Sequence, residues 1–219
     1  PRNLATAAIA VLRQDDDINA LLEAIGAAPR ALGRTLEERA NAASRLVQDP
    51  LFQTLLAAAP VPDAAIELLL VQLRTDLLAV VQDEPASLEV ELGLVVAIAR
   101  QAFLNEYVFF TGAEEQGRVD ALIAELDHDE LEFGTGVAAR IALVAAYRPL
   151  ASTPLAARLR DLDLPALAEL LREQLIEPAE EARLRSTLPL LKPAVDATSL
   201  AVQQQYEQNP YPRWTRCSL

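Results

Sequence analysis

Hydrophobic residues recur along most of this chain at steps of three and four positions, the spacing typical of amphipathic α-helices. The segment 63–82 shows the pattern most clearly. Its apolar stripe consists of Ile66, Leu69, Leu70, Leu73, Leu77 and either Val80 or Val81. Alternating apolar and polar runs do not occur at any length, so strands are not expected.

Capping residues and prolines mark where the predicted helices begin and end. Asp49 followed by Pro50 has the order of an N-cap and a first helical residue, and Thr35 with Glu38 has the capping-box spacing. Pro85 ends one helix, and Ser87 caps the next. We expect helices near 3–13, 16–26, 35–47, 50–58, 63–82, 88–110, 114–126, 128–147, 154–161, 164–175, 178–187 and 196–208.

The segment 88–110 carries apolar residues on most of its faces, which predicts the central and largely buried helix. The short connections between helices predict an all-α, multi-helix orthogonal bundle. We expect one helical domain over residues 1–202, with a soft internal boundary near 148–154 where proline and small residues interrupt the pattern. Residues 203–219 are expected to form an extended tail rich in proline and aromatic residues.

The end of the chain gathers large aromatic side chains in a protein with few of them. Proline fixes φ and lacks an amide donor, so 209–212 (Asn-Pro-Tyr-Pro) should run extended, near polyproline II. Aromatic side chains on such a segment are favoured anchors at interfaces. Two interpretations stay open: the tail folds back onto its own bundle, or it docks on a partner.

Composition narrows the classes of function. The chain has 219 residues, 52% of them hydrophobic, and a formal charge of −13, which disfavours binding to the phosphate backbone of nucleic acids. The purely apolar runs, of which 94–99 is among the longest, are far too short to span a membrane. With one cysteine, Cys217, no internal disulfide can form, and we expect a soluble protein of the reducing cytoplasm.

Two weak signals for chemistry each favour an ordinary explanation. Gly134 and Gly136 imitate a nucleotide-binding loop, but the residues before them are acidic and unsuited to a buried strand. Glu125 and His128 have the spacing of two metal ligands on a helix, but His128 is the only histidine of the chain. We therefore predict no catalytic residue, no metal site and no cofactor site in this chain.

Several stretches together resemble the N-terminal α-helical region of bacterial class I S-adenosylmethionine-dependent methyltransferases. The stretch most specific to that family is Tyr206-Glu207-Gln208-Asn209-Pro210-Tyr211-Pro212-Arg213-Trp214. The others are Asn105-Glu106-Tyr107-Val108-Phe109 with the pair Glu114-Glu115, Asp49-Pro50-Leu51-Phe52, and Tyr147-Arg148-Pro149-Leu150. Their order and spacing cover residues 49–214.

The resemblance implies that the parent protein is a methyltransferase whose catalytic domain and S-adenosylmethionine site would lie beyond Leu219. This chain would then be a non-catalytic helical domain that positions a substrate or a partner against that domain. The alternatives are a free-standing protein-interaction module, which binds another protein or a second copy of itself, and a small-molecule-binding bundle. The candidate residues for the interface or groove are Asn105, Glu106, Tyr107, Tyr206, Asn209, Tyr211, Arg213 and Trp214.

Asn105 and Glu106 have two interpretations of their own. They end a helix that is predicted to be buried, and buried polar groups need partners. They could hold the bundle together by bonding loop amides or one of the arginines Arg74, Arg100 and Arg148, or they could line the groove.

Overall fold

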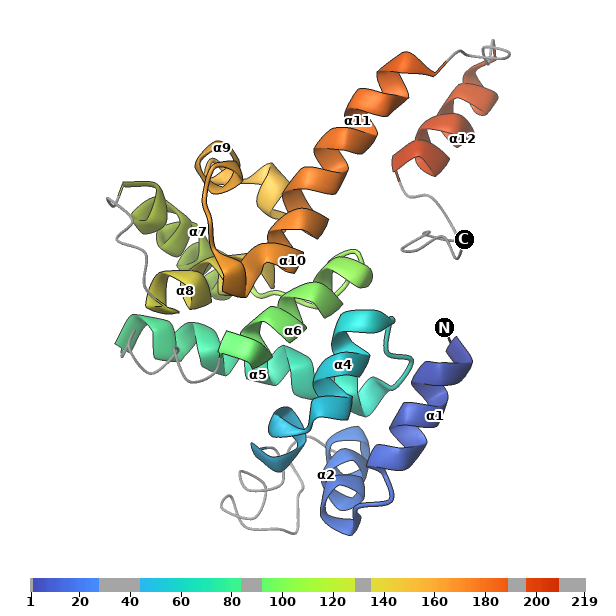
Figure 1. The fold of residues 1–219 in the computed structure, drawn as a ribbon. Coiled ribbons are helices and arrows are strands. Elements are labelled where there is room, and N and C mark those ends of the chain that lie inside the picture. Colours follow the sequence, from blue (N-terminus) through green and yellow to red (C-terminus); the bar gives the residue numbers. More distant parts are fainter. Residues whose placement is uncertain (1, 28–43, 84–91, 129–134, 189–195, 209–219) are drawn as a thin grey trace. The chain divides into compact units, whose positions relative to one another are not determined.

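The computed structural model describes residues 2–27, 44–83, 92–128, 135–188 and 196–208 (Figure 1). Within these ranges every regular element is a helix, which confirms the predicted all-α class. None of the helices in the described part of the chain is both long and apolar enough to cross a membrane.

The regular elements follow one another along the described ranges. The α-helices are α1 (Arg2–Leu12), α2 (Asp16–Ala27), α4 (Pro50–Ala58), α5 (Ala64–Asp83), α6 (Leu92–Leu104), α7 (Ala113–His128), α8 (Thr135–Ala145), α9 (Ala156–Arg160), α10 (Ala168–Leu171), α11 (Glu177–Thr187) and α12 (Ala197–Gln208). Two 3₁₀ turns, η2 (Leu150–Ser152) and η3 (Pro165–Leu167), and one π-helical turn, η4 (Arg172–Ile176), connect the later helices. Residues 44–48 are also helical.

The chain divides into two units, Pro1–Ala179 and Glu180–Leu219. The soft boundary that the sequence indicates near 148–154 lies inside the first unit. In the second unit, α12 matches the helix expected over 196–208 and continues to Gln208, so residues 203–208, which are also part of the expected extended tail, are helical. The first proline that excludes a helix comes later, at position 210. Residues 209–219 lie outside the described part of the chain.

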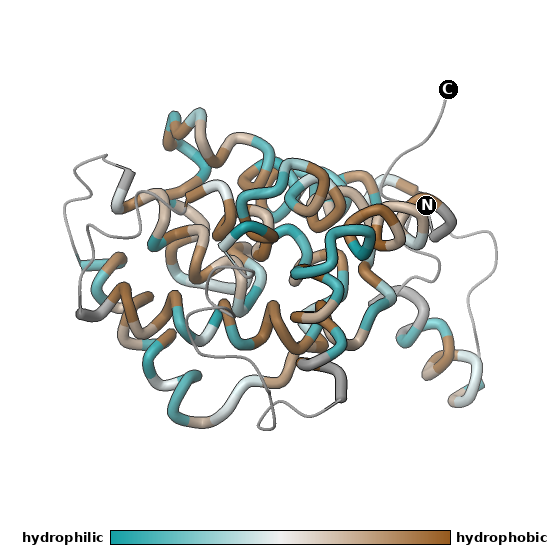
Figure 2. Tube along the Cα trace, turned by 90° about the horizontal axis from the view of Figure 1, so that it is seen from below, coloured by the Kyte–Doolittle hydropathy of each residue, from teal (hydrophilic) through white to brown (hydrophobic). Residues whose placement is uncertain are grey.

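Helix α6 forms the centre of the first unit, as its apolar residues predict. It packs against α4, α5, α8 and α10 (Figure 1). Its buried side chains are Leu94, Val95, Ala97, Ile98, Ala99, Gln101 and Ala102. Full burial of one such leucine or isoleucine contributes roughly 1.5–3 kcal/mol. The helices carry both hydrophobic and hydrophilic residues, seen as brown and teal stretches of the tube (Figure 2).

Two predicted helices have the wrong limits, and the two expected separately over 164–175 and 178–187 are continuous through η4. The helix expected over 88–110 ends at Leu104, because the chain then enters a left-handed turn. The helix expected over 128–147 is α8, which begins at Thr135, while His128 is the last residue of α7.

The predicted cap of α4 is confirmed. Oδ1 of Asp49 accepts hydrogen bonds from the amides of Leu51 and Phe52 at 2.7 and 3.1 Å. The predicted caps Thr35 and Ser87 lie outside the described residues.

Candidate functional site

Helix α6 ends in a tight turn over residues 105–110, which we call the 105–110 turn. The amide of Tyr107 donates to the carbonyl of Ala102 at 2.9 Å, and the amide of Glu106 donates to that of Phe103 at 3.1 Å. These two bonds define a Schellman motif, which needs a left-handed residue after the helix. Glycine usually fills that position. Here Glu106 and Tyr107 have φ of 55° and 58°, so two ordinary residues adopt a strained backbone conformation.

The turn is anchored on both sides of its exposed residues. The hydroxyl of Tyr107 donates to the carbonyl of Ala145 at 3.2 Å, and Phe109 is only 5% exposed. Between and beyond these anchors, Val108 is 69% exposed and Phe110 is 79% exposed. The turn therefore presents two large apolar side chains to solvent from a fixed backbone.

A buried arginine holds the far side of this turn. Arg74, in the middle of α5, is 1% exposed. Its Nη2 donates to the carbonyl of Phe110 at 2.8 Å and to the hydroxyl of Thr111 at 3.1 Å, and its Nη1 donates to the carbonyl of Ala146 at 3.4 Å. Its guanidinium also lies over the ring of Tyr147, 4.1 Å from the ring centroid. One arginine thus joins α5 to the chain after α6 and to the end of α8.

Glu115 and Tyr147 complete what we call the Arg74 cluster, which consists of Arg74, Thr75, Glu115 and Tyr147. The hydroxyl of Tyr147 donates to Oε1 of Glu115, and the same oxygen accepts from the hydroxyl of Thr75 at 3.0 Å. This carboxylate oxygen lies 3.8 Å from Nη2 of Arg74. Burial raises the pKa of Tyr147, and the hydrogen bond to the Glu115 carboxylate raises it further.

These contacts suit the Arg74 cluster to a structural role. A phenol with a raised pKa stays neutral and is a poor base or nucleophile near neutral pH. Both Nη atoms of the guanidinium and Oε1 of the carboxylate have partners within the bundle. Among the described residues, Nε of Arg74 is the one buried side-chain nitrogen or oxygen without a partner. We conclude that the Arg74 cluster fixes the 105–110 turn in place and leaves little for chemistry.

In the part of the chain that it describes, the structure does not show the hydrogen bonds expected for the side chains of Asn105 and Glu106. Asn105 is half-buried and Glu106 is exposed, and neither side chain makes a hydrogen bond within the described residues. The two other arginines considered as partners are engaged elsewhere. Arg100 donates to Glu173 and Arg148 pairs with Asp120. Arg74 does contact this region, but through the backbone carbonyl of Phe110.

The remaining candidate residues belong to the second unit. Tyr206 lies in the last part of α12, where the structure describes its backbone but not its side chain. Asn209, Tyr211, Arg213 and Trp214 lie outside the described residues. Whether they join Asn105, Glu106 and Tyr107 in one groove therefore stays a prediction.

Sequence reasoning did not single out Arg74, Glu115 and Tyr147 as one cluster. One signal was present. Arg74 follows Leu70 by four positions and precedes Leu77 by three, so it lies on the apolar stripe of its helix. A charged residue on such a stripe requires buried partners. Glu115 and Tyr147 could not be identified as those partners from spacing, because each comes from a different helix or its end.

The weak chemical signals have ordinary surroundings. His128 is exposed at the end of α7, and Gly136 lies in the first turn of α8. Gly134 lies outside the described residues. Across the described ranges, no three histidine, cysteine, aspartate or glutamate side chains are grouped so that they could hold a metal ion.

Comparison with known proteins adds no family assignment. The sequence matches no protein-family model, no curated protein and no solved structure.

Proposed function

We propose that this chain is the non-catalytic helical region of a class I S-adenosylmethionine-dependent methyltransferase, and that it binds the catalytic domain through the 105–110 turn. The observation that carries the proposal is the pair of exposed side chains, Val108 and Phe110, on an anchored and strained turn. Backbone strain of this kind persists only where the surrounding structure holds it, and it often marks functional segments.

The chemistry of the Arg74 cluster supports a role in binding. Its arginine, carboxylate and phenol bond to one another and to nearby backbone, which keeps the turn rigid. A rigid apolar turn loses little conformational entropy when a partner covers it, so more of the contact energy remains as affinity. Residues 105–109 of the turn also form one of the stretches that resemble the methyltransferase family.

The proposal places the methyl donor outside this chain and the protein in the cytoplasm. S-adenosylmethionine titrated into this chain in a calorimeter should therefore give no binding heat. Saturable binding with a micromolar dissociation constant would contradict the assignment of the cofactor to another domain.

The test of the partner begins with the gene. Downstream of the codon for Leu219, the reading frame should encode an apolar strand that ends in Gly-x-Gly. A frame that closes without such a domain would contradict the proposal and favour a free-standing interaction module. If the domain is encoded, it is produced separately and titrated against this chain.

Matched variants then test the surface. Val108→Ser with Phe110→Ser should weaken the complex at least about tenfold, because exposed aromatic anchors dominate interface energies. Leu51→Ser with Leu68→Ser, two exposed apolar residues on α4 and α5, serves as the control and should leave the affinity unchanged. Equal weakening by both pairs, or by neither, would show that the turn is not the contact surface.

A further inference from the structure

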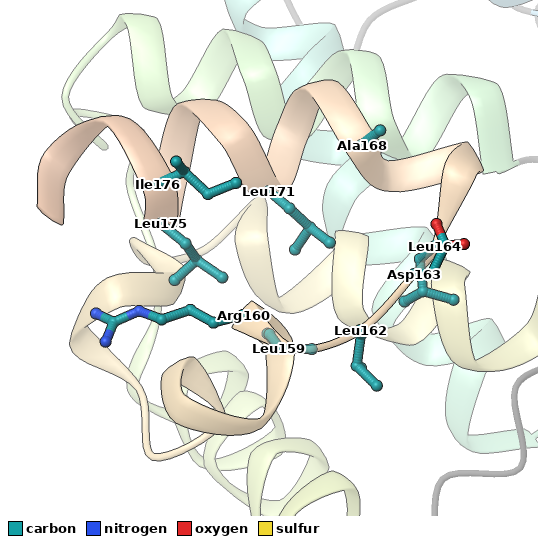
Figure 3. Close-up of a pocket in the computed structure, with 9 residues that line it drawn as sticks. All are labelled: Leu159, Arg160, Leu162, Asp163, Leu164, Ala168, Leu171, Leu175 and Ile176. Carbon is teal, nitrogen blue, oxygen red and sulfur yellow. The ribbon is translucent and has the colours of Figure 1, made fainter. Parts of the chain in front are cut away.

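A pocket of about 170 Å³ opens beside α9 and α10 (Figure 3), and no residue of the 105–110 turn lines it. Its lining is mostly aliphatic. The residues around it are Leu159, Arg160, Leu162, Asp163, Leu164, Ala168, Leu171, Leu175 and Ile176. An apolar cavity of roughly 150 Å³ holds a benzene molecule, so this pocket has room for one ring or a short branched chain.

The π-helical turn η4 shapes one wall of this pocket. A π-turn adds one residue to a helical turn, which rotates the following side chains by about 100° relative to a regular helix. Leu175 and Ile176 are the last two residues of η4, and both line the pocket. Such turns are frequent at functional sites.

The opposite side of the π-turn is fixed by a buried amide. Gln174 is fully buried, and its Oε1 accepts from the amide of Leu150 at 3.1 Å. Its Nε2 donates to the carbonyl of Ala145 at 3.4 Å. Because Gln174 is anchored to the end of α8 and to η2, the wall carrying Leu175 and Ile176 is held in place before any ligand arrives.

The charges at the rim indicate which ligand would fit. Figure 3 shows Arg160 at the end of the pocket near Leu175, and Asp163 at the other end near Leu164. Both side chains belong to exposed residues, and neither forms an ion pair or hydrogen bond within the described residues. A guanidinium matches a carboxylate in shape and charge. The carboxylate of Asp163 would repel a second negative charge at the far end.

We propose that this pocket binds a small monocarboxylate with a compact apolar body, such as an arylalkanoate. The apolar body fills the space between Leu159 and Leu171, and the carboxylate pairs with Arg160 at the rim. This site is separate from the surface in the proposed function, and either proposal can fail without the other.

The experiment is an NMR titration of the whole chain with 3-phenylpropionate and, separately, with the uncharged 3-phenylpropanol. We expect saturable shifts of amides around the pocket, with a dissociation constant of about 1 mM for the acid, a value suited to a ligand of this size. If the acid causes no saturable shift up to about 10 mM, some ten times that dissociation constant, the proposal is overturned. The pocket would then be better explained as the binding site for a side chain of a protein partner.

Two variants with matched controls locate the site. Arg160→Gln should weaken the binding of 3-phenylpropionate about tenfold, because a charge-assisted hydrogen bond is lost. The same variant should weaken the binding of 3-phenylpropanol less than about twofold. Arg172→Gln, an exposed arginine of η4 that does not line the pocket, should change neither.

The second variant tests the apolar space. Ala168→Leu adds volume at an exposed position of the pocket wall and should abolish binding of both compounds. Ala166→Leu, in η3 and outside the pocket lining, should leave binding intact. Unchanged binding to the Ala168→Leu variant, or equal loss of the acid and the alcohol with Arg160→Gln, would overturn the proposal.

Discussion

Replacing Arg74 by methionine removes the guanidinium of the Arg74 cluster while keeping a side chain of similar length in the core. The carbonyl of Phe110 and the hydroxyl of Thr111 lose a charged donor at 2.8 and 3.1 Å. Glu115, whose side chain is 13% exposed, loses the cation 3.8 Å away. The 3.4 Å contact with the carbonyl of Ala146 is at the limit for a hydrogen bond and contributes little.

The expected loss of stability follows from these contacts. A hydrogen bond to a charged group contributes about 1.5–3 kcal/mol, which gives roughly 3 kcal/mol for two bonds at the lower figure. The carboxylate left without its cation brings the total to about 3–5 kcal/mol, the usual cost of removing one partner of a buried ion pair. A domain is typically stable by about 5–15 kcal/mol, so the variant should unfold at a much lower urea concentration.

The assay is urea unfolding at pH 7, followed by circular dichroism at 222 nm. Arg118→Met is the control, because Arg118 forms an exposed pair with Glu114 on α7 that contributes under about 1 kcal/mol. In the double variant Arg74→Met with Glu115→Gln, the loss should be smaller than the sum of the two single losses by about 1 kcal/mol or more. A loss below about 1 kcal/mol for Arg74→Met, equal to that of the control, would refute the central role of this arginine.

Three further predictions concern the left-handed turn at Glu106, the loss of stability at high pH through Tyr147, and the N-terminal cap of α5 at Asp63. Glu106→Gly should stabilise the protein by up to about 1 kcal/mol in the same urea assay, because glycine adopts φ near 55° without strain; a loss of similar size would contradict the strain argument. The pKa of Tyr147 is raised in the folded state. The contribution of its hydroxyl to the free energy of unfolding is therefore complete below pH 10 and is lost as the pH rises beyond that. Tyr147→Phe should cost about 1–2 kcal/mol at pH 8 and flatten the fall in stability measured between pH 10 and 11. Burial alone raises the pKa of Asp63, but hydrogen bonds from Arg13 and from amides of α5 lower it overall, so Asp63→Ala should cost about 1–2 kcal/mol at pH 7. In urea titrations, the loss of stability caused by Asp63→Ala should shrink as the pH falls below 3.8 and approaches the lowered pKa of Asp63. An unchanged loss at pH 3 would count against a stabilising role of the ionised carboxylate.

The helices and their core were predictable because they depend on local patterns. The stripe in α5 and the apolar faces of α6 are spaced at the helical period, and that spacing alone identifies the buried side. Asp49 before Pro50 located the start of α4, because a cap is made by residues adjacent in sequence.

The end of α6 and the π-turn were not predictable, because each depends on distant contacts. No glycine marks the left-handed turn at Glu106, so the sequence shows no stop before the aromatic residues that follow. The anchors of that turn, Arg74 and Ala145, come from other helices. Within η4, Gln174 likewise bonds to Leu150, a distant residue that local spacing does not identify.

The left-handed pair at the end of α6 also restricts which substitutions the gene can accumulate. Among homologous sequences, positions 106 and 107 should admit glycine, asparagine and aspartate but exclude valine, isoleucine, threonine and proline, whose side chains clash or whose φ is fixed elsewhere. Exposed helical positions such as Gln116 carry no such constraint and should vary freely. Variability at solvent-facing Glu106 would therefore be governed by backbone geometry, even where no partner selects its charge.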